Sequence, residues 1–244
     1  MLFVSAAFVC AAVSAATIRV TVTNTAPANG IHFTPVWVGF HNGTFDIFDS
    51  GAAASAELER LAEDGNTTPL DGLFQVSGAG ATSATIGGAP IAPGASASMT
   101  FTLDGTLASN RYFSFAAMVI PSNDAFVSNG DPMSFPIFDA MGNFTGADFI
   151  PMLVWDAGTE VNDEIPANTA FLGQAVPDTG TPEGGVITAH PGFLVGGNIV
   201  SAFPNANFNN LLRVQVEEVP EPGTLVLLTG ALPILAIVRR RIRR

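Results

Sequence analysis

The chain has 244 residues, of which 48% are hydrophobic and only 12% are charged. This composition is too apolar for a disordered chain and too poor in charge for a coiled coil. The 25 Gly and 17 Pro residues indicate many short strands and turns, and the length suits one all-β domain.

The charge is strongly acidic and unevenly distributed. All nine basic residues are Arg, and five of them lie in the last six positions, namely Arg239 to Arg241, Arg243 and Arg244. Outside that cluster four Arg face 21 acidic residues, a formal charge of −17. Because nucleic-acid binding needs a basic surface, we expect no nucleic-acid partner, whereas the acidic body favours cation binding.

The N-terminus is interpreted as a signal peptide spanning residues 1–15. Residues 2–16 form an apolar run that ends in small residues, and Val13-Ser14-Ala15 fits a signal-peptidase site. The run is too short for a permanent transmembrane helix. The single cysteine, Cys10, lies inside it, so we expect no disulfide in the mature protein.

Residues 16–218 are expected to form one domain of short strands. Period-2 alternation or continuous apolar runs predict strands at residues 17–24, 33–40, 97–103, 112–120, 149–155 and 212–217. Pro35 suggests that the second strand lies at a sheet edge or carries a bulge. The runs at 112–120 and 149–155 are nearly continuously apolar, which indicates central strands.

One helix is predicted in this domain, near residues 54–64. Ala54, Leu58, Leu61 and Ala62 follow helical spacing, and Gly65 is the expected C-terminal stop. Residues 77–98 are rich in Gly, Ala, Ser and Thr, and residues 205–210 are rich in Asn. We interpret both segments as surface loops with weak strands.

Several blocks of sequence resemble the spondin domain. They read HFTP at 32–35, GFHNG at 39–43, FDSG at 48–51, LAEDG at 61–65, MVIPSNDAF at 118–126 and WDAGTE at 155–160. The chain departs from that family where Ala125 replaces an aromatic residue, and it lacks the disulfides of animal members. The resemblance implies an antiparallel β-sandwich of C2-like topology with a calcium ion at one end, and extracellular matrix or adhesion proteins as relatives.

The same resemblance implies calcium ligands. Asp124 and Asp156 each follow an apolar strand, and the resemblance makes them the primary ligands, with Asp104 as a possible third. Calcium takes six to eight oxygen ligands, including carboxylates, carbonyls and water. Glu160, Asp163 and Glu164 could add negative charge nearby. Without the resemblance, an Asp directly after a strand is read more simply as a turn residue.

Catalytic signatures are weak. His32, His41 and His190 have no zinc-ligand spacing, and no Gly-x-Ser-x-Gly elbow occurs. We therefore expect no enzyme, although an acidic chain always offers carboxylates that could pair as a glycosidase acid and base. Trp37 and Trp155 are interpreted as core residues, with sugar stacking as the alternative.

The C-terminus, residues 219–244, has the form of a sorting signal. Val219-Pro220-Glu221-Pro222 precedes an apolar run at 224–238 and the Arg cluster, which would hold that end of a membrane segment in the cytoplasm. This order resembles the PEP-CTERM signal of Gram-negative bacteria. The resemblance implies processing by an exosortase and release to an extracellular polysaccharide matrix, and the alternative is a single-pass anchor.

The sequence thus predicts a secreted, non-enzymatic, calcium-binding β-sandwich at a bacterial cell surface or in its matrix. Matrix polysaccharide or another surface protein is the expected partner, and the membrane is expected to be contacted only through the C-terminal tail. The alternatives are an extracellular hydrolase acting on that matrix and a purely structural matrix component.

Overall fold

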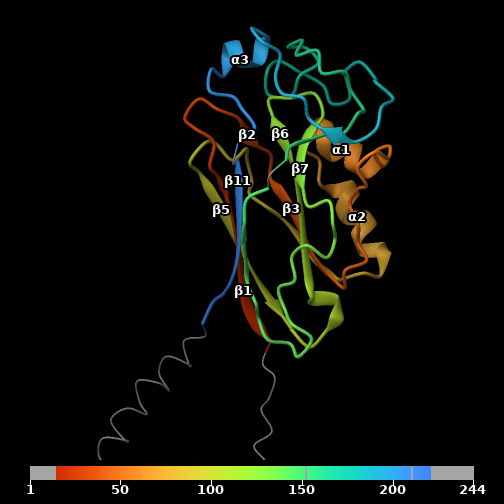
Figure 1. The fold of residues 1–244 in the computed structure, drawn as a ribbon, viewed down its shortest axis with the longest axis vertical. Helices are drawn as coiled ribbons and strands as arrows, with labels where there is room; N and C mark the ends of the chain where they lie inside the picture. The colour runs from red at the N-terminus through yellow and green to blue at the C-terminus, as the bar shows by residue number, and fades with distance from the viewer. Residues whose placement is uncertain (1–14, 152, 210, 221–244) are drawn as a thin grey trace, which may run out of the picture.

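The structure, a computed structural model, describes residues 15–151, 153–209 and 211–220. Two antiparallel sheets face each other, one with the strand order β5-β1-β11-β8 and one with the order β10-β9-β7-β6-β3-β4, in which β2 also pairs with β6 (Figure 1). This arrangement confirms the predicted all-β sandwich. The predicted signal peptide up to residue 14 and the sorting signal from residue 221 lie outside the described residues.

The first sheet is built from strands far apart in sequence: β1 (Ala16–Asn24), β5 (Ser96–Leu103), β8 (Ala147–Phe149) and β11 (Leu212–Glu218). In this register Val20 lies opposite Val216 on one side and Met99 on the other. The predicted alternation of β1 is confirmed, because Ile18, Val20 and Val22 are fully buried while the intervening Thr and Arg side chains face outward.

The second sheet contains seven strands: β2 (His32–Phe33), β3 (Val36–His41), β4 (Thr82–Ile86), β6 (Tyr112–Ile120), β7 (Ala125–Ser128), β9 (Trp155–Asp156) and β10 (Thr188–Ala189). The central place predicted for β6 is confirmed, since it pairs with β3 and β7. Buried residues alternate between its two faces, because this sheet is covered on both.

Helices cover the outer face of the second sheet. α1 (Ala56–Asp64) begins at the N-cap Ser55 and ends at Gly65, the predicted stop, whose φ is 66°. The expectation of a single helix is wrong, because α2 (Thr68–Ser77), the short α3 (Asn198–Ala202) and a 3-10 turn at Ala108–Asn110 are also present. α2 contains Gly72, a weak helix former, and packs Phe74 against Trp37 in the core.

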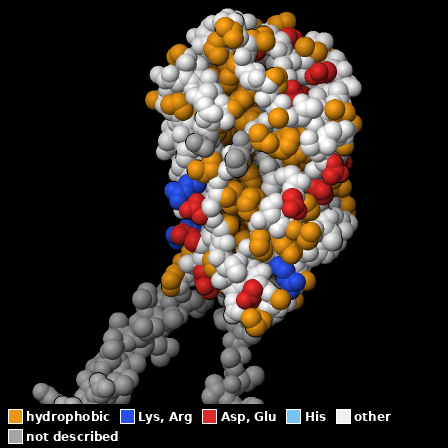
Figure 2. Space-filling view, viewed as in Figure 1, with side chains coloured by type: hydrophobic (Ala, Val, Ile, Leu, Met, Phe, Trp, Pro, Cys, Tyr) orange, Lys and Arg blue, Asp and Glu red, His pale blue; other side chains and the backbone are white. Residues whose placement is uncertain are grey.

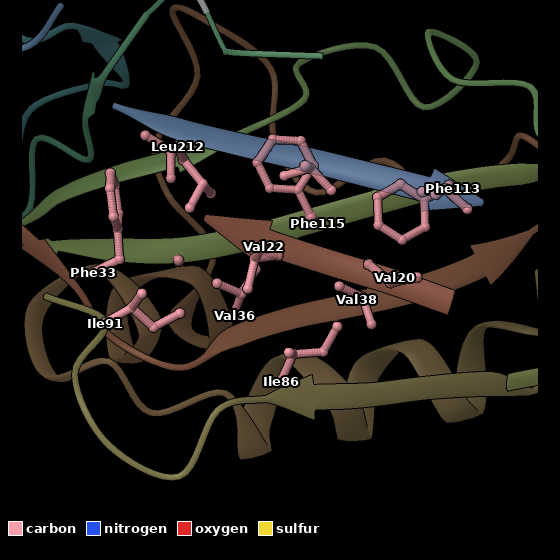
Figure 3. Close-up of a cluster of buried hydrophobic side chains, with 14 of the residues drawn as sticks. Val20, Val22, Phe33, Val36, Val38, Ile86, Ile91, Phe113, Phe115 and Leu212 are labelled. Atoms are coloured by element: carbon pink, nitrogen blue, oxygen red, sulfur yellow. The ribbon is translucent and has the colours of Figure 1, made fainter. Parts of the chain in front are cut away.

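The main core fills the space between the two sheets. Val20, Val22 and Leu212 from the first sheet meet Phe33, Val38 and Phe115 from the second (Figure 3). A second cluster lies between the second sheet and the α1–α2 pair, and contains Trp37, Leu58, Leu61, Phe74 and Phe126. The prediction that Trp37 is a core residue is confirmed.

Two predicted strands need correction. The strand expected at 33–40 is divided at Pro35 into β2 and β3, and β3 lies inside its sheet between β4 and β6, not at an edge. The strand expected at 149–155 does not form. Phe149 ends β8 in the first sheet and Trp155 begins β9 in the second, so the chain crosses between sheets where a continuous strand was predicted.

Within the described residues, no helix combines the length and apolarity required to cross a membrane. The described ends of the domain lie side by side, since Ile18 pairs with Glu218 in the first sheet. The first and last described residues therefore lie at the same end of the sandwich, at the bottom of Figure 1. α3 and the connection from β6 to β7 lie at the opposite end.

Candidate metal site

Asp124 lies in the tight connection between β6 and β7. The Ser122 hydroxyl stabilises this connection by donating to the Val119 carbonyl at 2.5 Å and accepting from the Ala125 amide at 3.1 Å. Because both strands are buried, the connection is buried too, and Asp124 has 0% exposure. The fold thus places a carboxyl group inside the protein at the end of the sandwich.

The two oxygens of the Asp124 carboxylate have different surroundings. Oδ2 accepts hydrogen bonds from the Thr159 amide at 2.8 Å, the Thr159 hydroxyl at 3.2 Å and the Glu160 amide at 3.1 Å. Oδ1 is buried and has no hydrogen-bond partner in the described structure. Burial, together with the charge of Asp156, raises the pKa of Asp124 to about 6 despite these hydrogen bonds.

Asp156 is brought beside Asp124 by strand pairing. β9 pairs with β7 so that Asp156 lies opposite Ala125, the residue after Asp124. Its Oδ1 accepts from the Gly158 amide at 2.8 Å, and its Oδ2 accepts from the Asn162 side-chain amide at 2.5 Å. The expectation that the two aspartates meet at one end of the sandwich is therefore confirmed.

Glu160 is a third acidic residue of this region. Its Oε1 accepts from the Gly180 amide at 2.8 Å, whereas Oε2 is buried with no hydrogen-bond partner in the described structure. Burial, followed by the charges of Glu63 and Asp124, raises the pKa of Glu160 to about 7. From the sequence, Glu160 is expected only to add negative charge near the two aspartates. The available signal was its place as the acidic last residue of the WDAGTE block.

Asp104 lies at the other end of the sandwich. Asp104 follows Leu103, which pairs with Ala16, so Asp104 lies beside the start of β1. The Asp124 connection lies beside the end of β1, because Asn24 there donates to the Ile31 carbonyl and the next residue, His32, pairs with Ile120 at the end of β6. Oδ1 of Asp104 accepts from the Thr106 amide at 2.9 Å and the Thr106 hydroxyl at 2.6 Å in an exposed turn. Asp104 therefore does not share a site with Asp124 and Asp156.

A second acidic group surrounds Arg60 on α1. Oxygens of Glu59, Glu63 and Asp178 lie within 4.8 Å of one another. Arg60 contacts all three, with distances of 3.1 Å to Glu59 and 3.3 Å to Asp178, so the guanidinium supplies the cation there. In the described residues this is the one acidic trio so close together. An ion at Asp124 must consequently draw ligands from carbonyl, amide and water oxygens as well.

A polar layer supports the aspartates from behind. His190 Nε2 lies 3.1 Å from Asn162 Oδ1, and the Gly192 amide donates to His190 Nδ1 at 3.1 Å. Burial lowers the pKa of His190 to about 4, so its neutral ring donates through Nε2 and orients the Asn162 amide toward Asp156. A cavity of about 10 Å³, lined in part by Asn123, Asn162 and His190, has room for one water.

The other side chains considered for a functional role, His32, His41 and Trp155, pack within the fold. His41 is fully buried, with Nε2 2.9 Å from the Ser114 hydroxyl, and His32 packs against Phe171 and Phe203. Trp155 is partly exposed and lines a shallow groove of about 340 Å³, so its interpretation as a core residue is only partly right.

Comparison with known proteins gives one family. Residues 18–166, which include Asp124, Asp156 and Glu160, match the family model described as Spondin_N. The search of curated proteins gave no match.

Proposed function

The chain belongs to the Spondin_N family, and from this membership we propose that it is a secreted calcium-binding module for adhesion or matrix binding. The family indicates an extracellular, matrix-related protein. Calcium binding, adhesion and the route of sorting are the further parts of the proposal. Each has support of its own in the sequence or in the described residues.

One observation carries the calcium proposal: the bare Oδ1 of Asp124. A buried carboxylate oxygen without a partner destabilises the folded state, because no hydrogen bond offsets its desolvation. A bound cation would offset it. The adjacent Asp156 adds the carboxylate oxygens that calcium prefers, and Glu160, whose Oε2 also has no hydrogen-bond partner in the described structure, adds negative charge nearby.

Asp124 and Asp156 are the residues that would hold the ion, together with carbonyl, amide and water oxygens, and Glu160 would add negative charge nearby. When bound, calcium would neutralise their mutual repulsion and tie the β6–β7 connection to the segment 156–164. Magnesium would stabilise less, because it demands near-ideal octahedral geometry and gives up its waters reluctantly. The role proposed for the ion is structural: it fixes the loops at the end of the domain that faces away from the two chain ends.

A groove offers a surface for matrix polysaccharide. It is lined by the aromatic rings of Trp155, Phe135 and Phe149 and by the polar side chains of Asn129 and Ser134. Phe135 and Phe149 stack with ring centroids 3.7 Å apart. Aromatic faces beside amide and hydroxyl groups suit a neutral sugar. Figure 2 shows apolar side chains gathered along the middle of one face.

The sorting route is proposed from the sequence alone. Residues 219–244 carry the Val-Pro-Glu-Pro motif, the apolar run and the Arg cluster, which support recognition by an exosortase at the surface of a Gram-negative bacterium. Release would then deliver the domain to the matrix. Another surface protein remains the alternative partner to polysaccharide.

Two measurements test the proposal. Calorimetric titration of the purified chain with calcium is expected to give one site, which Asp124→Asn removes while Asp104→Asn retains it. Retention of the protein on the isolated matrix polysaccharide of its host should weaken in Trp155→Ala and in chelator. If titration gives no heat and no saturable site, the calcium proposal is wrong.

A hydrolase is the second candidate, because the pKa values of Glu63 and Glu160 are both raised. Burial raises both to about 7, a range suited to general acid catalysis. However, the two residues are only 2% and 3% exposed, and neither lines the cavities described above. Their burial favours the binding module. A purely structural matrix component is the third candidate, and it would bind calcium without retaining polysaccharide.

A further inference from the structure

β5 is an open edge of the first sheet. It pairs with β1 on one side, and among the described residues no strand pairs with its other side (Figure 1). An unpaired strand edge presents a row of backbone donors and acceptors to other chains. At eight residues, β5 is long for such an edge.

Proteins usually protect strand edges with charge, proline or short length, and β5 has none of these. Its sequence SASMTFTL contains only uncharged residues, and no charged side chain occurs anywhere from Gly72 to Leu103. The opposite edge of the same sheet differs. β8 has only three residues, and its Asp148 binds Arg213 at 2.8 Å and 2.6 Å.

We propose that two copies of this chain associate through β5, with the two edge strands paired antiparallel about a two-fold axis. An isologous contact of this kind needs a surface that is complementary to itself, and a strand edge meets that requirement. This self-complementarity favours a second copy as the occupant, and the absence of charge at the edge permits it. Two bodies this acidic repel over most of their surfaces, but the segment 72–103 brings no like charges together.

The expected association is weak. Pairing along one strand buries less surface than a standard stable interface, so the dimer should form and dissociate with concentration. A two-fold axis at Thr100 places Ser98 opposite Thr102 of the second copy. The side chains of all three residues are exposed in the monomer, so hydroxyl groups would line the contact.

The test compares two charge-matched variants by sedimentation equilibrium. The full chain is used in mild detergent, which shields the apolar run at 224–238. Ser98→Glu combined with Thr102→Glu places like charges across the contact and should weaken dimerisation about tenfold. Thr17→Glu combined with Thr21→Glu adds the same charge one strand inward, on β1, and should leave dimerisation nearly unchanged.

Thermal unfolding of each variant at low concentration shows whether its monomer remains folded. The proposal also predicts that amide hydrogens of β5 exchange more slowly as protein concentration rises. A wild-type chain that stays monomeric at all concentrations overturns the proposal. So does a dimer that both double variants weaken equally, or one that neither weakens, because the contact would then lie elsewhere.

Discussion

The carboxylate of Asp124 shows how one side chain can satisfy the fold and still require a ligand. Three donors from Thr159 and Glu160 converge on Oδ2, which fixes the segment after β9 against the β6–β7 connection. Oδ1 faces none. Asn at this position could keep an acceptor for those donors while losing the charge. Asp124→Asn therefore separates the structural role from cation binding.

Glu63 should make stability depend on pH between pH 6 and pH 8. Burial raises its pKa from 4.5 to about 7, so over the interval from about 4.5 to 7 the folded state holds a proton that the unfolded state has released. Stability from this group is present at acidic pH and declines as the pH rises through 7. In chelator, the free energy of unfolding of Glu63→Gln relative to that of the protein that keeps Glu63 should therefore be about 1 kcal/mol higher at pH 8 than at pH 6.

Urea unfolding of both proteins at the two pH values measures this gain. Both proteins carry Glu160→Gln, because the charge of Glu63 raises the pKa of Glu160 and the substitution at Glu63 would otherwise change that titration too. His41 and His190, whose pKa values are lowered to about 4, contribute equally to both proteins. A constant difference between the two proteins would show that Glu63 ionises normally in the fold.

For the candidate metal site, the sequence predicts the types of residue that come together more successfully than it predicts their positions in the fold. Asp124 follows β6 and Asp156 is the last residue of β9, and strand pairing brings them together as expected. Asp104 was misplaced because a residue after a strand could lie at either end of the sandwich, and the end is set by strand direction. Glu160 was underrated because its burial depends on Gly180, twenty residues away.

α3 and the loop before it are held by one buried carboxylate. Glu164 accepts from the Leu194 amide at 2.5 Å through Oε1 and from the Ile199 amide at 3.1 Å through Oε2. Glu164→Ala leaves these amides without their acceptor and should cost on the order of 2–4 kcal/mol of unfolding free energy. It should also speed proteolysis within residues 190–200.

Denaturant unfolding and limited proteolysis check this prediction, with the exposed Glu183→Ala as the matched control, which should change stability by less than about 0.5 kcal/mol. Equal effects of the two substitutions would contradict the anchoring role of Glu164.

Among the elements, those with a clear period could be predicted from sequence. β1, β5 and β11 alternate because one face meets the core and the other faces water. β6 is apolar along nearly its whole length because its sheet is covered on both faces. α2 could not be predicted from the sequence, because tertiary packing of Leu70 and Phe74, not helix propensity, stabilises it. The change of sheet between residues 149 and 155 could not be predicted either, because an apolar run does not reveal which sheet each of its ends joins.

The whole molecule places its chain ends and its candidate metal site at opposite ends. Val219 still donates to the Thr17 carbonyl at 2.8 Å, so the tail leaves beside the start of the domain. A chain tethered by that tail would present the Asp124 end outward. This orientation suits adhesion to a partner beyond the cell's own surface.

Processing at both ends is a prediction for the secreted protein. Intact mass of the secreted form should lack residues 1–15 and the tail beyond Val-Pro-Glu-Pro. Neutral replacements of Arg239 to Arg241, Arg243 and Arg244 should impair membrane orientation or retention before cleavage. Recovery of only the full-length chain, and only from membranes, would favour a permanent anchor. Normal processing of the Arg variant would remove the role given to the cluster.

Thermal unfolding in calcium and in chelator tests the central claim most directly. At calcium concentrations 100-fold above Kd, the free energy of unfolding of wild type should rise by about 2.7 kcal/mol, which corresponds to a rise in Tm of several degrees. Asp104→Asn should keep this rise, because Asp104 lies at the far end, and Asp124→Asn should lose most of it while melting at least as high as wild type in chelator. Identical wild-type melting in calcium and chelator, or a full calcium response in Asp124→Asn, would contradict a calcium site at Asp124.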